Sequence, residues 1–399
     1  MKSLIKQVVV GVFDLFRKII GQFDPKNKVY FLGTTDPAII QNITERFRFY
    51  APHLELTILG KNELRFLDIF KIQFGLNPIL IWGQDSRIPF WLRKLRSDIY
   101  DVNFTTNPGD GWEWVRFGEA VATVAEKASD ASSRFNEIVA VLKTQKKNKV
   151  FLFGTGPSLD WSWQKTWNDG YRVVCNTIVR DKELFDFISP DFIAAGDAIY
   201  HFGHTDFARA FRKDLKRRLS ETKVHFIYPA QFHMIVIREL GEFKERLIPI
   251  PVGKSKSISN DLTKDFHLPA LGNALALLLL PVGCTLSRNV YLWGFDGRAP
   301  TDKLFWSNSI KHSYPELMGS LQAAHPKFYD HHVPKEDPNK YVKTVLGDVL
   351  EEAFNEAENK GWSFTMMHFS WTRALQKRFK VGFDIPRDEK PAHYGTATT

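Results

Sequence analysis

Residues 150–160, with the sequence VFLFGTGPSLD, could form a turn that holds an anion. The apolar residues 150–153 predict a strand, and small residues then lead into a helix start. Glycines let backbone N–H groups come close to a phosphate, and a helix N-terminus adds partial positive charge. We therefore expect a nucleotide-phosphate site here, although such a turn is also an ordinary structural connection. The turn consists of Gly154, Thr155, Gly156, Pro157 and Ser158.

Polar residues close several later apolar segments that predict strands. Asn176 ends RVVCN, Asp197 follows FIAAG, and Asp296 follows NVYLW within the sequence GFDGR. The carboxyl ends of parallel strands gather at one edge of a sheet, where ligands bind. A carboxamide there can contact a ribose or a base edge, and a carboxylate can bind a ribose hydroxyl or a metal. Each residue could instead cap a turn or a helix. Arg298 beside Asp296 suits recognition of an acid or a phosphate.

A group of histidines lies late in the chain, at His312, His325, His331 and His332. The last two belong to FYDHHVP and precede Pro334, so we expect them in a loop. A loop histidine can reach a cleft and act as a general base near neutral pH, and the alternative is a surface or capping residue. No metal site is expected at this pair. The sequence also lacks GxSxG, GxxxxGK[ST], HExxH and DxD motifs, which removes the usual support for hydrolases, P-loop kinases and metal-dependent sugar transferases.

Composition predicts a soluble globular protein with two domains. The chain has 399 residues, of which 44% are hydrophobic and 25% charged, and a formal net charge of +9. That charge suits anionic lipid, nucleic acid or an acidic sugar donor without choosing among them. Cys175 and Cys284 lie far apart without metal-ligand spacing, which argues against disulfides and structural zinc and fits a reducing cytoplasm.

The first residues differ from the rest. Apolar residues recur at helical spacing over 1–20 among several lysines and arginines. We expect an amphipathic helix within 1–25, either on the inner-membrane surface beside anionic lipid or packed on protein. No apolar run reaches the ~18 residues of a spanning helix, and the longest, 274–282, predicts a buried core helix.

Alternating segments predict an α/β fold: a Rossmann-like, mainly parallel sheet domain with a smaller N-terminal α/β domain. The smaller domain covers 26–145, and its aromatic residues Trp82, Trp91, Trp112 and Trp114 could stack on sugars or form core. A long helix over 119–144 leads to a hinge, and the larger domain covers 149–379. A helix over 335–359, a strand over 362–367 and a flexible tail over 380–399 follow. The other predicted elements are strands at 28–33, 54–60, 78–83, 150–153, 172–176, 192–196, 223–228 and 289–293, and a helix at 36–50.

The chain resembles the bacterial sialyltransferases that decorate lipooligosaccharide in the order of its motifs. That order is GTGPSL, VVCNT, a glycine in a long apolar helix, VYLWGFD and a late loop histidine. It is also similar to the domain of motility accessory factors and of a pterin diphosphokinase-like group. The resemblance covers about 149–379. It implies that the glycine turn wraps CMP, that Asn176 contacts CMP, and that His332, or else His331, is the catalytic base. The residues that this resemblance implies and the polar residues at the strand ends together form the set of candidate nucleotide-binding residues. They are Gly154, Thr155, Gly156, Pro157, Ser158, Asn176, Asp197, Gly272, Asn273, Gly294 and Asp296.

The chain departs from that family at several positions. Thr155 and Leu271 replace an Asn and a Ser, and the two tyrosines that help the departing phosphate are missing. Arg298, Lys303 or Tyr314 could replace those tyrosines.

The function we expect is inverting transfer of a sialic-acid-like sugar from a CMP-activated donor to a surface glycan, such as lipopolysaccharide or capsule. A nucleoside monophosphate is a good leaving group, so no cofactor is obligatory and Mg²⁺ would only stimulate. The expected partners are the donor, the acceptor glycan and the inner membrane through 1–20, but no nucleic acid, and a homo-oligomer stays an open alternative to a single copy. The alternatives are a metal-dependent diphosphokinase using Asp197 and Asp296, and a non-catalytic glycan- or nucleotide-binding protein.

Overall fold

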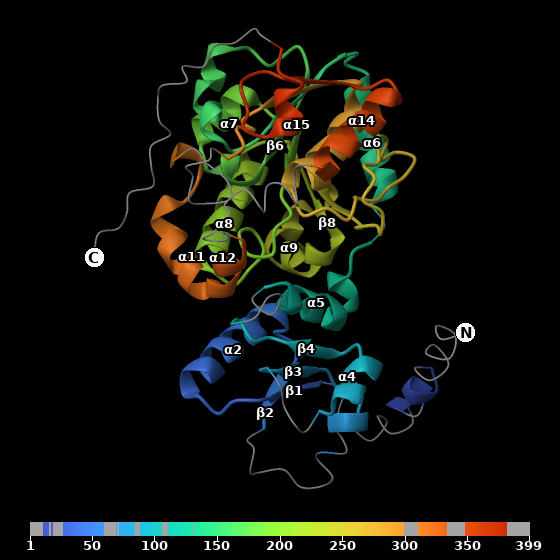
Figure 1. Cartoon of the computed structure of the whole chain (residues 1–399), viewed down its shortest axis with the longest axis vertical. Coiled ribbons are helices and arrows are strands. Elements are labelled where there is room, and N and C mark those ends of the chain that lie inside the picture. The colour runs from blue at the N-terminus through green and yellow to red at the C-terminus, as the bar shows by residue number, and fades with distance from the viewer. Residues whose placement is uncertain are drawn as a thin grey trace. The chain divides into compact units, whose positions relative to one another are not determined.

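The chain forms two compact units, residues 1–125 with 325–327, and residues 126–324 with 328–399. The computed structural model describes residues 11–15, 17–18, 27–59, 69, 72–83, 88–105, 111–129, 131–298, 310–332 and 348–380. Each unit contains a parallel sheet with helices, which confirms the predicted α/β, Rossmann-like class (Figure 1). Within the described ranges, no helix combines the length and the apolar character needed to cross a membrane.

The first unit has a parallel sheet of strand order β2-β1-β3-β4. The predicted helix at 36–50 is confirmed: Asp36 accepts hydrogen bonds from the N–H groups of Ala38 and Ile39, and Pro37 begins the helix. Three strands lie where the sequence predicts them, and β4 was missed because its apolar run is short. The elements are β1 (Lys28–Leu32), α2 (Pro37–Tyr50), β2 (Glu55–Ile58), β3 (Ile79–Ile81), α4 (Phe90–Leu95), β4 (Ile99–Asp101), α5 (Trp112–Val121) and the 3-10 turn η2 (Val124–Glu126).

The described part of the N-terminal segment, residues 11–15 and 17–18, is helical. Arg17 is buried and donates hydrogen bonds to the carbonyl of Gly75 at 3.0 Å and to the carboxylate of Asp98 at 2.6 Å. Val12 and Leu15 remain 64% and 62% exposed. One side of this helix therefore packs on its own unit, as one of the two interpretations expected, while its other side is exposed. The rest of 1–25 lies outside the described residues.

The predicted helix over 119–144 is wrong. The α5 helix ends at Val121, and α6 (Ser132–Lys143) is a separate helix. Its first residues, Ser132 and Ser133, favour a helix start over a helix interior because their short polar side chains compete for backbone hydrogen bonds. The buried residues Phe135 and Val139 of α6 belong to the core of the second unit. The division between the units therefore falls at Ala125 rather than at 145–149.

The second unit has a seven-stranded parallel sheet of order β11-β10-β5-β6-β7-β8-β9. Strands β5 to β9 follow one another to one side, and the chain then returns to place β10 on the other side of β5. The strand order thus reverses between β5 and β10, which is where open α/β sheets bind ligands. The strands are β5 (Val150–Phe153), β6 (Tyr171–Cys175), β7 (Phe192–Ala194), β8 (His225–Pro229), β9 (Leu247–Ile250), β10 (Asn289–Trp293) and β11 (Ser363–Met366). The sequence analysis predicted all of them except β9.

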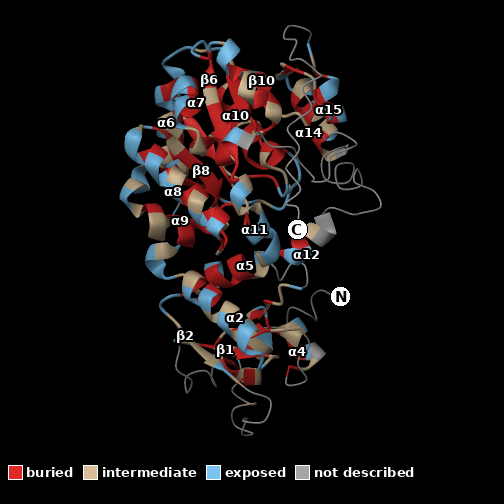
Figure 2. Cartoon of the chain, turned by 90° about the vertical axis from the view of Figure 1, so that its left-hand side faces the viewer, coloured by how far each residue is buried: buried red, intermediate tan, exposed pale blue. Residues whose placement is uncertain are grey.

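The predicted buried helix is confirmed as the π-helical turn η7 (Leu275–Leu279) continued by α10 (Leu280–Leu286), every residue of which is buried. Figure 2 shows α10 as buried, whereas α8 carries exposed residues on its outer side. The other helices are α7 (Lys182–Ile188), α8 (Asp206–Glu221), α9 (His233–Leu240), α11 (Met318–Ala324), α12 (Pro326–His332), α14 (Asp348–Asn359) and α15 (Arg373–Gln376). Short 3-10 helices are η3 (Pro157–Gln164), η4 (Asn176–Arg180), η5 (Ala230–Phe232), η6 (Gly241–Arg246), η8 (Ile310–His312) and η9 (Pro315–Leu317).

The predicted helix over 335–359 is present from Asp348 onward as α14. Its earlier residues, Lys303 and the predicted flexible tail from residue 381 lie outside the described residues.

Candidate functional site

Two glycine turns meet at the point where the strand order reverses. The N–H of Gly154 donates to the carbonyl of Trp293 at 2.7 Å, and that of Gly156 donates to the carbonyl of Gly294 at 2.8 Å. A Cβ on Gly154 would overlap the Gly294 carbonyl, and a Cβ on Gly156 would overlap the Asp296 carboxylate. The absence of side chains at these positions is therefore needed for the ends of β5 and β10 to touch.

Ser158, Asp296 and His368 form a hydrogen-bonded network behind these turns. The carboxylate of Asp296 accepts from the Ser158 N–H at 3.2 Å and from the Ser158 hydroxyl at 2.8 Å. The same hydroxyl lies 2.8 Å from Nε2 of His368, which accepts from the Gly294 N–H at 2.9 Å. The other ring nitrogen, Nδ1, lies 2.7 Å from the Phe369 carbonyl. Because a carbonyl only accepts, Nδ1 carries the ring proton.

Burial sets the electrostatics of this network. It raises the pKa of the Asp296 carboxyl, and it lowers the pKa of His368. Ser158 and His368 are both buried. This is not the arrangement of a nucleophilic triad, because the serine lies between the other two groups and is enclosed. The network ties together the chain segments that follow β5, β10 and β11.

The structure thus brings the residues of the predicted phosphate turn together, but their polar groups are hydrogen-bonded within the protein. The N–H groups of Gly156 and Ser158 have acceptors inside the protein. The segment after Pro157 is the 3-10 helix η3 rather than an α-helix, and its first turn faces the carboxylate of Asp296. The sequence analysis missed His368, although its position directly after a predicted strand was a usable signal.

Among the predicted site residues, Asn176 best fits a ligand contact, because its side chain can still accept a hydrogen bond. It lies at the end of β6 with a φ of 52°, in the left-handed region that non-glycine residues seldom adopt. Its Oδ1 is buried and has no hydrogen-bond partner in the described part of the chain. Val174 pairs with Phe153 on the neighbouring strand, so Asn176 and Thr155 both lie two residues beyond that pair. A buried acceptor without a donor costs about 1–3 kcal/mol, which a bound ligand could offset.

Asp197, Gly272 and Asn273 take structural roles. The Asp197 carboxylate accepts from the N–H groups of Ile199 and Tyr200 at 2.7 and 2.8 Å, which closes the turn after β7. The Asn273 side chain accepts from the N–H of Leu275 at 2.9 Å and caps the helix that continues into α10. Gly272 was predicted inside that helix but lies in the bend before it, because the helix begins only after the Asn273 cap.

Arg298 and Tyr314 are both buried. The Tyr314 hydroxyl donates to the carboxylate of Asp214 on α8 at 2.7 Å, and the guanidinium of Arg180 lies 4.9 Å from the ring centre. Burial raises the pKa of Tyr314. The tyrosine that was predicted to help a departing phosphate therefore anchors its segment to α8.

The prediction that His331 and His332 lie in a loop is wrong, since both belong to the end of α12. A proline is tolerated in a first helical turn, so Pro326 can begin the helix ahead of them. Their side chains lie outside the described residues. The helix is held beside the segment that follows β7, because the hydroxyls of Tyr329 and Tyr200 are 2.5 Å apart and Phe328 packs on Tyr200. The backbone of α12 accordingly lies at the carboxyl edge of the sheet.

His312 is a buried member of this edge that sequence reasoning named but did not place. Its Nε2 lies 3.0 Å from the Asp160 carboxylate and its Nδ1 3.3 Å from that of Asp181, although neither pair has hydrogen-bonding angles. Asp160 belongs to η3, and Asp181 caps α7. The buried ring therefore lies between these two segments, each of which places a carboxylate beside one of its nitrogens. Among the described residues, no three His, Cys, Asp or Glu side chains form a metal-binding group.

The sequence matches no protein-family model, and no curated protein is similar enough to count as a match.

Proposed function

We propose that this protein is a glycosyltransferase that binds a CMP-activated acidic sugar at the carboxyl edge of its seven-stranded sheet and transfers the sugar to a glycan with inversion. The observation that carries the proposal is Asn176, a residue in the left-handed region whose buried Oδ1 has no partner among the described residues. Backbone strain of about 1–3 kcal/mol persists where the surroundings enforce it, and it clusters at ligand sites. Asn176 also lies beside the reversal of strand order.

The proposed reaction at the carboxyl edge of the sheet needs a group that binds the nucleotide, a base and a group that stabilises the leaving phosphate. The Asn176 carbonyl oxygen would accept from the cytosine amino group or from a ribose hydroxyl. The acceptor hydroxyl must lose its proton as its oxygen attacks the anomeric carbon, while the bond to the CMP phosphate breaks and the phosphate leaves with the electron pair. His332 or His331 at the end of α12 would take that proton, and Arg298 would steady the phosphate or the sugar carboxylate.

The glycine turns have a supporting role in this proposal. Because Ser158 and Asp296 bind each other, they would fix the ends of β5 and β10 against which the nucleotide rests. The protein would work in the cytoplasm, with the exposed side of its N-terminal helix on the inner membrane. Free, buried Cys175 and Cys284 are compatible with that compartment.

The direct test is a thermal-shift panel of CMP, CDP, UDP, GDP and ATP, each with and without magnesium. A ligand that binds only the folded chain raises its melting temperature. We expect CMP to give the largest shift without needing magnesium. A shift with ATP that requires magnesium would replace the transferase with a diphosphokinase, and no shift with any nucleotide would refute the proposal.

Asn176→Gly sharpens the test, because glycine accepts the left-handed backbone but removes the side chain. We expect the free energy of unfolding to be unchanged or up to about 1 kcal/mol higher, and the CMP affinity to fall about tenfold. Ser189→Gly is the matched control, since Ser189 has a φ of 50° at the end of α7. Its CMP affinity should equal that of the unmodified chain. Unchanged CMP binding in Asn176→Gly would remove the proposal's main support.

The base is tested separately with His331→Ala and His332→Ala. One of them should lower turnover about 100-fold or more while CMP affinity stays within about twofold. If both variants keep turnover within about threefold, neither histidine is the base.

A further inference from the structure

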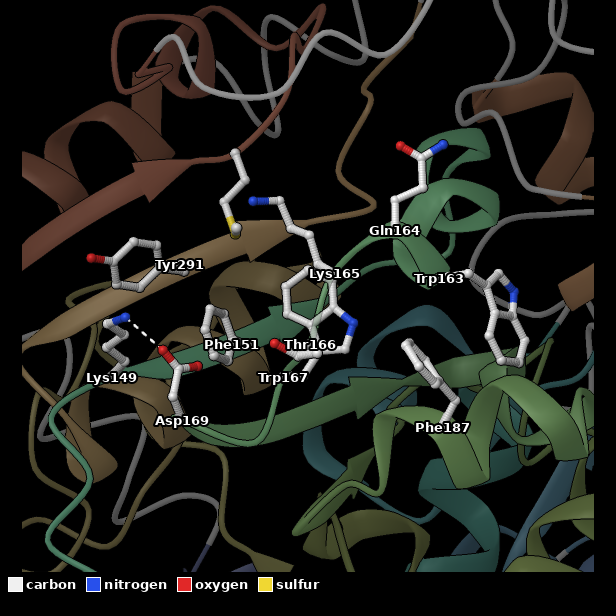
Figure 3. A pocket seen from close by; sticks show the side chains of 11 residues that line it. Lys149, Phe151, Trp163, Gln164, Lys165, Thr166, Trp167, Asp169, Phe187 and Tyr291 are labelled. Atoms are coloured by element: carbon white, nitrogen blue, oxygen red, sulfur yellow. Dashed lines mark hydrogen bonds and ion pairs between the residues drawn. The ribbon is translucent and has the colours of Figure 1, made fainter.

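A hollow of about 600 Å³ lies in the second unit, away from the meeting point of the glycine turns. Phe151 of β5 and Tyr291 of β10 form its floor (Figure 3). Their strand neighbours Val150, Leu152 and Val290 pack into the core with α10. Because side chains alternate along a strand, the hollow lies over the opposite face of the sheet from α10.

One end of the hollow is an aromatic ledge made by Trp163 of η3 and Phe187 of α7. Their ring centres are 4.6 Å apart at an angle of 34°, so nothing fits between the rings. Trp163 is nevertheless 46% exposed and Phe187 38% exposed. The pair therefore offers an outer aromatic surface to whatever enters the hollow, and exposed aromatic groups of this kind commonly mark binding sites.

Polar side chains also line the hollow. Figure 3 shows Gln164 beside the aromatic ledge, Lys165 in the middle of the view near Trp167, and the ion pair of Lys149 with Asp169, 2.7 Å apart, at the far side. Lys149 also lies 5.8 Å from the ring centre of Tyr291. An apolar ledge next to amide, ammonium and carboxylate groups matches a sugar, whose C–H face covers an aromatic ring while its hydroxyls form hydrogen bonds.

The size and position of the hollow suit a ligand that reaches the proposed nucleotide edge. Ligand pockets hold about 300–1,000 Å³, and this hollow lies within that range. The ledge is connected to the proposed nucleotide edge by a single element, because η3 begins at Pro157 beside Asp296 and ends at Gln164. At about 2.0 Å per residue, a regular 3-10 helix of that length spans about 16 Å.

We propose that this hollow binds an oligosaccharide and is the acceptor-glycan site of the protein. The assignment to the acceptor rests on the transferase proposed above, whereas oligosaccharide binding itself does not. A glycan lying on Trp163 and Phe187 would extend along η3 toward the end of β5, where its terminal hydroxyl would meet the donor.

The experiment uses the full chain on an array of defined glycans, followed by calorimetric affinities for the glycans that bind. Trp163→Ala should weaken binding about tenfold, and Trp163→Phe should recover part of that loss because a ring remains. Val141→Ala is the control, since Val141 of α6 is an exposed apolar residue of the same unit and does not line the hollow. It should bind glycans like the unmodified chain. CMP affinity should be the same in all these variants.

The outcomes separate the two proposals. If the unmodified chain retains no glycan, or if Trp163→Ala binds glycans as well as Val141→Ala does, the hollow is not the glycan site. If Trp163→Ala lowers CMP affinity as much as glycan affinity, the hollow belongs to the nucleotide instead. If the unmodified chain binds glycans through Trp163 but shows no nucleotide shift, the transferase fails while the oligosaccharide site stands.

Discussion

Replacing Gly156 with alanine distinguishes a structural turn from a ligand cradle. Gly156 has a φ of −67° and a ψ of 166°, which alanine adopts without strain. Any effect therefore comes from the added Cβ. That atom would overlap the Asp296 carboxylate and lie 2.8 Å from the Gly294 carbonyl oxygen, which is closer than real Cβ contacts come.

The size of the effect follows from what must move. The Asp296 carboxylate would leave the Ser158 hydroxyl and N–H, which it contacts at 2.8 and 3.2 Å. Hydrogen bonds to a charged group contribute about 1.5–3 kcal/mol, and overpacking costs about 1–3 kcal/mol. We expect Gly156→Ala to lower the free energy of unfolding by about 3–5 kcal/mol. At about 2–4 °C per kcal/mol, the melting temperature would fall by about 6–20 °C.

The assay is thermal and urea unfolding followed by circular dichroism, with CMP affinity measured on the same samples. Gly241→Ala is the control, because Gly241 is helical and its Cβ would lie an ordinary 3.7 Å from the Ile237 side chain. That change should be neutral or stabilise by up to about 1 kcal/mol. If Gly156→Ala stays within about 1 kcal/mol of the unmodified chain but loses CMP binding, the glycine serves the ligand and our structural reasoning is refuted.

Two further predictions concern buried polar groups. Tyr314→Phe should lower stability by about 1 kcal/mol through loss of the bond to Asp214 and leave kcat unchanged, whereas a 100-fold lower kcat at unchanged stability would show that the hydroxyl serves the reaction. Burial lowers the pKa of His201 to about 3 and that of His233 to about 4, so below about pH 6.5 only the unfolded chain takes up these protons. Stability should therefore fall from pH 6.5 to 4.5 by about 2–3 kcal/mol for each histidine in urea unfolding. His233→Asn, which still accepts from the Tyr228 hydroxyl, should reduce that slope by about 1.4 kcal/mol per pH unit, and an unchanged slope would mean that His233 is not the group that titrates.

Local sequence was sufficient for most of the elements. Apolar runs such as 150–153 and 289–293 predicted their strands, and Asp36 with Pro37 predicted the start of α2. The failures have physical reasons. The helix predicted over 119–144 breaks because none of the described residues 119–129 is buried, and the buried apolar face begins only at Ala131. Strand β9 was missed because LIPI contains a proline, which is tolerated there on the edge strand of the sheet.

Sequence also predicted which polar residues would gather at the carboxyl edge of the second sheet, because parallel strands bring their ends together whatever their order. It could not decide what those residues contact. Whether Asp296 meets a ligand or Ser158 depends on the strand order, which places β10 next to β5.

The composition and periodicity of the chain thus determined that there are two α/β units and where most of their strands lie, since these depend on residues close in sequence. Tertiary structure alone decided that His368 joins Ser158 across 210 residues, that Asn176 is left with a buried oxygen lacking a described partner, and that Trp163 meets Phe187 beside a hollow. Such contacts are set by packing between segments distant in sequence, and no local pattern carries that information.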